Sequence, residues 1–179
     1  MKRTGMRIMG LLAIMMLFSA CAGSKASYSW KTPPKDREAL DKYRKVLVVV
    51  QAKEGVRLVP DVRERLGRRI DEYIRTEYAD KYIPVTALSA GPGTLGAQVS
   101  ITRYDDGVAF AQYVFSGQVR MRIDGEVTLW DWQTKERLAE FNVTKTFEWE
   151  RISGNSIKID DLEPDFAQGV VAGIAQQDQ

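Results

Sequence analysis

The chain of 179 residues contains no histidine and a single cysteine, Cys21. Zinc sites built from histidine and cysteine are therefore excluded, because they need several such ligands. The Ser-His-Asp and Cys-His arrangements of nucleophilic enzymes are excluded because each needs a histidine as its base. Catalysis by paired carboxylates or by serine with lysine stays open, but no motif in the sequence indicates either.

Long apolar runs are also scarce, and the longest one lies near the start. Residues 8–18 are apolar without a break, follow three basic residues and precede two small ones. A basic start, a short apolar core and small residues before a cut site are typical of a secretory signal. The run is too short for an ordinary membrane-spanning helix, which needs about 20 residues. The sequence therefore predicts a signal peptide at residues 1–20.

The cysteine stands directly after this segment, in the order Phe18-Ser19-Ala20-Cys21. The segment resembles the signals of bacterial lipoproteins, whose lipobox ends in small residues and a cysteine, although Phe18 replaces the usual aliphatic residue. The resemblance implies that Cys21 carries a diacylglycerol thioether and, on its freed amino group, a further acyl chain. Stable anchoring needs more than one chain. The alternative is an ordinary signal peptide with an incidental thiol.

Ala22 follows the cysteine, where an aspartate in Gram-negative lipoproteins commonly marks retention at the inner membrane. By analogy with that family, we expect a lipid-anchored protein of the cell envelope, on the outer membrane and facing the periplasm.

Positive charge is not concentrated in the rest of the chain. Three of the 26 basic residues and none of the 24 acidic ones lie in residues 1–20, so the mature chain has a formal net charge of −1. Nucleic-acid binding requires a clustered excess of lysine and arginine. We therefore expect no nucleic-acid partner.

Residues 21–40 are predicted to be the lipidated cysteine and a flexible tether, since small and polar residues prevail there and Pro33-Pro34 stiffens the end. Tyr28 and Trp30 interrupt this segment. They are expected to dock on the domain or at the lipid interface, with partner binding as the alternative. Residues 41–179 are predicted to form a single domain.

The domain is predicted to open with a strand and a helix. Val46–Val50 is a continuous apolar and β-branched run, typical of a strand covered on both faces. From Pro60 to Tyr78, apolar residues recur at spacings of three and four, which predicts an amphipathic helix. Gly67 in its middle indicates a close approach to a sheet.

Alternation and turn residues predict the remaining elements. Asp124-Gly125 is a strong signal for a two-residue hairpin turn, and Gln133-Thr134-Lys135 indicates another turn. The predicted strands lie at Ile83–Leu88, Val99–Tyr104, Val119–Ile123, Val127–Leu129 and Leu138–Trp149, and a last helix is capped by Asp161. This order predicts an α+β fold, a two-layer sandwich with a mainly antiparallel five- to six-stranded sheet and two helices.

The stretch from Val99 to Leu138 resembles a family of small Gram-negative envelope lipoproteins whose domain has no known function. The shared positions are Val99, Ile101, Tyr104 and Gly107, followed by Val127, Leu129, Asp131, Thr134 and Leu138. Lys135 stands where the family usually has glycine. A weaker likeness is to the amino-terminal domain of the Tol-system protein TolB. Neither resemblance implies a catalytic residue.

Two motifs are better explained by structure than by binding. Gly91-x-Gly93-x-x-Gly96 has the letters of a dinucleotide motif, but a strand pattern follows where that motif needs a helix start. No cofactor is therefore expected. A cluster of four acids is a candidate calcium site: Asp160, Asp161, Glu163 and Asp165. Acids at the start of a helix also complement the helix dipole, and no calcium-loop spacing is present, so the structural explanation is preferred.

Trp130 and Trp132 flank Asp131 and are expected to share one strand face. Such a pair grips a glycan or a partner in some proteins, and packs structurally in more. We expect structure first and keep partner binding as the alternative for Trp130 and Trp132.

Three hypotheses for function remain. The first is a non-enzymatic, membrane-anchored lipoprotein that binds an envelope protein or glycolipid in envelope assembly or transport. The second is a periplasmic enzyme based on carboxylates or on serine and lysine. The third is a structural spacer without a specific ligand.

Overall fold

The computed structural model describes residues 25–105, 118–150 and 158–176. The predicted signal peptide and Cys21 lie outside these ranges. No helix among the described residues has the length and apolar character to cross a membrane.

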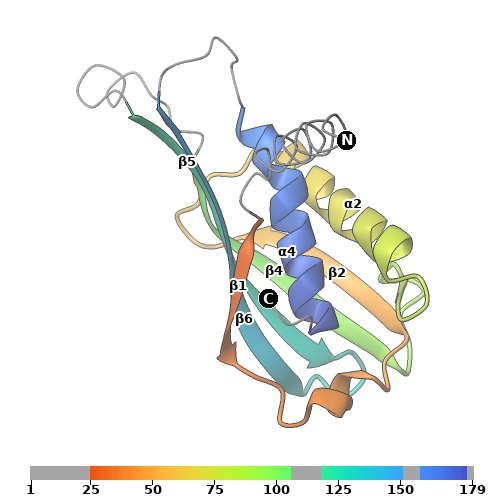
Figure 1. Cartoon of the computed structure of the whole chain (residues 1–179). Helices are drawn as coiled ribbons and strands as arrows, with labels where there is room; N and C mark the ends of the chain where they lie inside the picture. The colour runs from red at the N-terminus through yellow and green to blue at the C-terminus, as the bar shows by residue number, and fades with distance from the viewer. Residues whose placement is uncertain (1–24, 106–117, 151–157, 177–179) are drawn as a thin grey trace, which may run out of the picture.

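The described residues form one six-stranded sheet with two helices on one of its faces (Figure 1). The strands follow one another across the sheet in the order β1-β6-β5-β4-β2-β3. β2 is parallel to both β3 and β4, and the other neighbours are antiparallel. The strands are β1 (Ser27–Thr32), β2 (Lys45–Ala52), β3 (Ile83–Pro84), β4 (Thr94–Asp105), β5 (Gln118–Asp131) and β6 (Arg137–Glu150), and the helices are α2 (Pro60–Glu77) and α4 (Glu163–Ala175). The predicted α+β, mainly antiparallel two-layer sandwich is confirmed.

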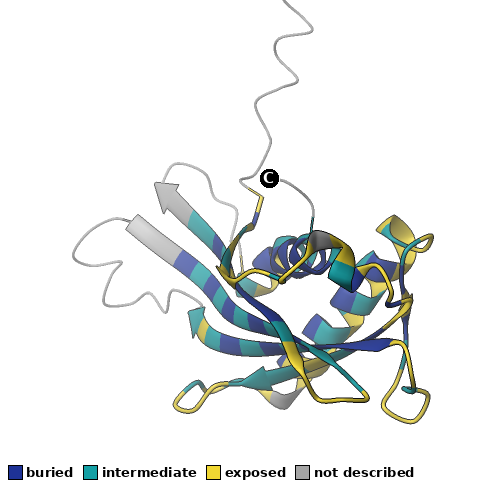
Figure 2. Ribbon diagram, turned by 90° about the horizontal axis from the view of Figure 1, so that it is seen from below, coloured by how far each residue is buried: buried dark blue, intermediate teal, exposed yellow. Residues whose placement is uncertain are grey.

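The helices cover the sheet because each has one apolar side. Val62, Leu66, Ile70 and Ile74 of α2 are buried, as the spacing predicts. α4 likewise buries Leu162 just before it and Phe166, Val170 and Ile174. Along the strands, buried and half-buried residues alternate (Figure 2). The core therefore lies between the helices and one sheet face, and the other face is open.

The predicted tether is partly wrong, because the folded domain begins before Asp41. Ser27–Thr32 pairs with β6, Ala26 is buried, and a short 3-10 helix at Arg37–Leu40 buries Leu40. Tyr28 and Trp30 dock on the domain, as expected, with ring centroids 5.7 and 5.1 Å from that of Phe141. These aromatic contacts to a distant strand fix a segment whose own composition looks flexible.

The predicted hairpin turn at Asp124-Gly125 is wrong, since both residues lie in the middle of the continuous strand β5. Gly125 pairs with Ile101 on one side and Val143 on the other. A Cβ at position 125 would come within 2.8 Å of Phe166 Cζ. The glycine is therefore needed for the approach of α4 to the sheet and not for a turn.

The strand at Val46–Val50 is confirmed, but it is not covered on both faces. β2 lies next to the edge strand β3, and Val49 on its open face is 40% exposed. The predicted strand at Ile83–Leu88 is shortened to Ile83–Pro84, and Leu88 is fully exposed. The N–H groups of Ile83 and Val85 donate to β2 and to the residue before it, so the nitrogen of Pro84 between them faces away from the sheet, as a proline on an edge strand does.

Two smaller expectations also change. A Cβ on Gly67 would lie 3.9 Å from Val50 Cγ2, an ordinary contact, so this glycine faces the sheet without being required there. Asp161 does not cap α4; its carboxylate accepts a hydrogen bond from the backbone of Lys158 at 2.8 Å, and the N-cap residue is Leu162.

Candidate functional site

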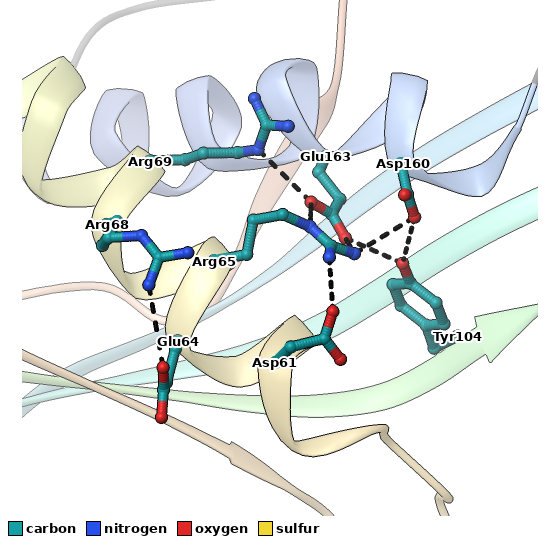
Figure 3. A network of polar contacts seen from close by, with 8 residues as sticks. All are labelled: Asp61, Glu64, Arg65, Arg68, Arg69, Tyr104, Asp160 and Glu163. Atoms are coloured by element: carbon teal, nitrogen blue, oxygen red, sulfur yellow. Dashed lines mark hydrogen bonds and ion pairs between the residues drawn. The ribbon is translucent and has the colours of Figure 1, made fainter.

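Among the described residues, a dense polar cluster joins the start of α4 to α2 and β4, and its centre is Glu163 (Figure 3). The Glu163 side chain is fully buried. Arg65 of α2 donates to both of its oxygens, at 2.7 and 2.8 Å. Arg69 adds a contact at 3.3 Å, and the Tyr104 hydroxyl donates at 2.8 Å. Both oxygens of this carboxylate therefore accept hydrogen bonds from within the protein.

Two further acids complete the surroundings of Arg65. Its guanidinium contacts Asp61 at 2.8 Å and Asp160 at 3.1 Å. The hydrogen bonds to Glu163 raise the pKa of Arg65 further above its usual value. Burial, and then the hydrogen bond to Glu163, raise the pKa of Tyr104. The arrangement holds an ion pair and a neutral phenol together, and it ties three elements into one unit.

The acidic cluster predicted around the start of α4 is thus explained mainly by ion pairs. Asp160 and Glu163 contact Arg65, and Asp165 forms an ion pair with the buried Lys145 of β6. Within the ranges that the structure describes, no group of three or more potential ligand residues could hold a metal ion. Sequence reasoning missed these cations because Arg65 and Lys145 lie on other elements, far from the acids in the chain.

The two predicted tryptophans make different contacts. Trp130 is in β5, on the open face, and its indole covers Gly96 of β4: a Cβ at position 96 would come within 2.2 Å of the ring. Trp132 lies just after β5, where Lys135 Nζ is 3.7 Å from the ring centroid. Both side chains are half-buried. Trp130 therefore has a packing role, while partner binding by the pair stays a prediction.

Asp131 between them anchors the turn to β6. Its carboxylate accepts from the Tyr43 hydroxyl at 2.7 Å and from the backbone N–H of Gln133 and of Thr134 at 2.8 and 2.9 Å. The Thr134 hydrogen bond first, and then that of Tyr43, lower the pKa of Asp131. This set is typical of a structural turn, and the turn predicted at 133–135 is confirmed.

A groove of about 530 Å³ runs beside β1 and the end of α4, and we name it the β1 groove. Tyr28 and Trp30 meet edge to face at 6.0 Å between ring centroids, and Trp30 also meets Phe141 edge to face. The groove is lined by Tyr28, Trp30, Pro33, Pro34, Lys35, Asp36 and Gln176. Sequence reasoning named the two aromatic residues but placed them in a tether, so the groove itself was missed.

The β1 groove and the Glu163 cluster differ in chemistry. The groove combines two aromatic and two proline side chains with the polar Lys35, Asp36 and Gln176, so it offers both apolar and polar contacts to another molecule. The cluster consists of acids and bases that are hydrogen-bonded to one another. The groove is therefore the better candidate for contact with another molecule.

No family model matches the sequence, and no curated protein matches it. The fold is similar to a variant of the PelC dodecamer from Paraburkholderia phytofirmans, with a TM-score of 0.52 and 10% identity, over 86% of this chain and 99% of that one. A minor lipoprotein from Acinetobacter baumannii has a TM-score of 0.46 and 13% identity, over 75% and 92% of the two chains. A member of a domain family of unknown function from Xanthomonas campestris has a TM-score of 0.42 and 12% identity, over 84% and 90%.

At this identity, the likeness to PelC shows the fold alone. Several of the other similar solved structures are bacterial lipoproteins, with TM-scores between 0.40 and 0.46. The likeness to the TolB amino-terminal domain stays a prediction.

Proposed function

We propose that this chain is a non-enzymatic lipoprotein, anchored through Cys21 to the periplasmic side of the outer membrane, that serves envelope assembly or transport as a binding module. The observation that carries the proposal is the contrast between the β1 groove and the Glu163 cluster. The groove, at about 530 Å³, is hollow, aromatic and next to the anchored end of the chain. The acids and the base of the Glu163 cluster are joined to one another instead of lining it.

Assembly into a larger complex fits this proposal. PelC, which shares the fold over 86% of this chain, forms a dodecamer. The β3 edge of the sheet leaves one side of a strand without a neighbouring strand among the described residues. Exposed edges can pair with other chains. We therefore expect the protein to act within a homo-oligomer or with an envelope partner.

Native mass spectrometry of the tagged protein, extracted from envelopes in mild detergent, tests the proposal. The expected result is an acylated chain in a complex of defined stoichiometry, with Cys21→Ser as the control that is absent from the membrane fraction. An acylated chain that is monomeric at every concentration and binds no envelope component would contradict the binding role and favour a spacer. Turnover of a substrate by the pure protein would favour the carboxylate or serine–lysine enzyme.

A further inference from the structure

Very little chain separates the predicted lipid anchor at Cys21 from the buried residue Ala26. Ala26 is buried, and a Cβ on Gly169 of α4 would come within 2.8 Å of its side chain. Ser27, the next residue, already pairs with Thr144. Five residue steps from Cys21 to Ala26 span at most about 18 Å when fully extended. A flexible segment of that length spans about 13 Å on average.

This distance decides which part of the domain is near the bilayer. The anchored end of the chain leads into β1, the strand at one edge of the sheet, and α4 lies beside it (Figure 1). Tyr28 is two residues beyond Ala26 and Trp30 is four. The β1 groove is therefore within reach of the headgroups, whereas the β3 edge lies five strand spacings away, about 24 Å across the sheet.

The side chains of this edge suit the interface between membrane and water. Tryptophan and tyrosine are the aromatic residues enriched at that level, because their rings are apolar and one end is polar. Tyr28 and Trp30 are each half-buried, with ring contacts to Phe141 in the domain. Two prolines continue the same surface without adding charge.

One cation lines the aromatic surface, Lys35, whose side chain is 94% exposed. Lys25, just before β1, and Lys31, within it, are also exposed. The acids that face these lysines are Glu140, at 2.8 Å from Lys31, and Glu136, at 4.0 Å from Lys35. Asp36 is the acid of the groove itself. The ammonium group of a long lysine side chain can reach lipid phosphates from such a surface while its methylene groups pack on apolar side chains.

We propose that the β1 edge, with Tyr28 and Trp30 at headgroup level, is the surface by which the acylated protein lies on its own bilayer. The β3 edge then points into the periplasm. The inference rests on the proposed function in one respect, the acylation of Cys21. It adds an orientation and a lipid contact that the anchor alone does not specify.

Site-directed nitroxide labels test this orientation. The mature acylated chain has no free thiol, because its only cysteine is the one that carries the lipid. Cysteine can therefore be introduced at Ser29 in β1 or, as the matched control, at Leu88 beyond β3. Both labelled proteins are reconstituted in vesicles of phosphatidylethanolamine with a minority of phosphatidylglycerol, some lipids carrying nickel on a chelating headgroup.

The expected result is a several-fold greater relaxation of the Ser29→Cys label than of the Leu88→Cys label by the headgroup nickel. Equal relaxation of the two labels, or the reverse order, in protein whose mass shows the acyl chains would overturn the docking while leaving the anchor intact. Protein without acyl chains would overturn the proposed anchor, and the docking with it.

A longer linker separates docking from passive tethering. Ten glycine and serine residues inserted between Ala22 and Gly23 allow Ala26 to lie farther from the lipid on Cys21, so the anchor alone no longer holds β1 near the bilayer. The Ser29→Cys label is expected to keep its greater relaxation, because Tyr28 and Trp30 bind the interface themselves. Loss of the difference between the two labels would overturn the β1 edge as a lipid-binding surface.

Discussion

At the scale of single residues, Trp130 and Gly96 act as a pair. The indole occupies the space that a side chain at position 96 would need, with 2.2 Å to an ideal Cβ. Trp130→Ala should cost on the order of 2 kcal/mol, less than a fully buried ring. Gly96→Ala alone should cost about 1–3 kcal/mol through overpacking.

The double variant gives the decisive outcome for this pair. In the Trp130→Ala protein, Gly96→Ala no longer meets a ring. It should then stabilise the domain by about 0.5 kcal/mol, because alanine lowers the conformational entropy of the unfolded chain. A change of sign between the two backgrounds, measured by urea unfolding, confirms the contact. Additive effects of the two substitutions would contradict it.

Two tyrosine hydroxyls make stability depend on alkaline pH. Burial first, and then hydrogen bonds to Glu163 and Asp131 respectively, raise the pKa of Tyr104 and Tyr43 above 10.0 in the folded protein. Unfolded tyrosines ionise near 10, while these two stay protonated to higher pH. The two hydroxyls therefore contribute fully to the free energy of unfolding below pH 10, and this contribution is lost as the pH rises above 10.

Thermal melts between pH 8 and about 11.5 measure this effect. The melting temperature should fall above pH 10, and Tyr104→Phe should make the fall shallower. A pH profile that is the same in Tyr104→Phe and in the unsubstituted protein would show that this hydroxyl does not titrate as described.

At the scale of elements, Glu163 joins α4 to α2 and β4. Glu163→Ala leaves Arg65 facing a cavity and removes the acceptor of Tyr104. Breaking a fully buried ion pair from one side costs about 3–5 kcal/mol. Arg65 is 23% exposed and keeps Asp61 and Asp160, so we expect about 1–3 kcal/mol here. Glu64→Ala is the matched control, because Glu64 and Arg68 form an exposed pair on α2 at 3.7 Å. That change should stay within about 0.5 kcal/mol, and equal costs for the two variants would contradict the central role of Glu163.

Replacement by alanine should have opposite effects on stability at the two helical glycines Gly169 and Gly67. A Cβ on Gly169 meets Ala26 at 2.8 Å and Val143 at 3.0 Å, so Gly169→Ala should push the start of β1 away and cost about 1–3 kcal/mol. A Cβ on Gly67 meets Val50 Cγ2 at 3.9 Å. Gly67→Ala should therefore stabilise α2 by up to about 1 kcal/mol.

Hydrogen exchange shows which part of the domain Gly169→Ala destabilises. Gly169→Ala should speed amide exchange in residues 26–32 more than in β4. Unchanged protection of β1 in Gly169→Ala would mean that α4 does not hold the anchored edge.

Sequence periodicity predicts the elements whose pattern is local. The apolar stripe of α2 and the run at Val46–Val50 are visible without knowledge of any partner. β1 was not predictable as a strand, because Ser27–Thr32 owes its order to β6 and Phe141, far along the chain. Asp124-Gly125 looked like a turn because the reason for the glycine, Phe166 on α4, is absent from the local pattern.

At the scale of the whole molecule, the predicted lipid anchor and the binding surface depend on different kinds of pattern. The predicted lipoprotein signal is a run of neighbouring residues, so it can be proposed without a structure. The β1 groove brings Tyr28 and Trp30 together with Gln176, from the opposite end of the chain. Only the folding of α4 beside β1 creates that surface.

The intact mass of the protein isolated from the cell envelope tests the central claim most directly. The account predicts a chain that begins at Cys21 and carries a diacylglycerol and a further acyl chain, since several chains are needed for stable anchoring. Cys21→Ser should give an unprocessed or soluble form without these lipids, because a hydroxyl does not replace the thiolate nucleophile. A mature chain that begins at Cys21 or nearby without any lipid, or a Cys21→Ser protein that still carries acyl chains at position 21, would contradict the account.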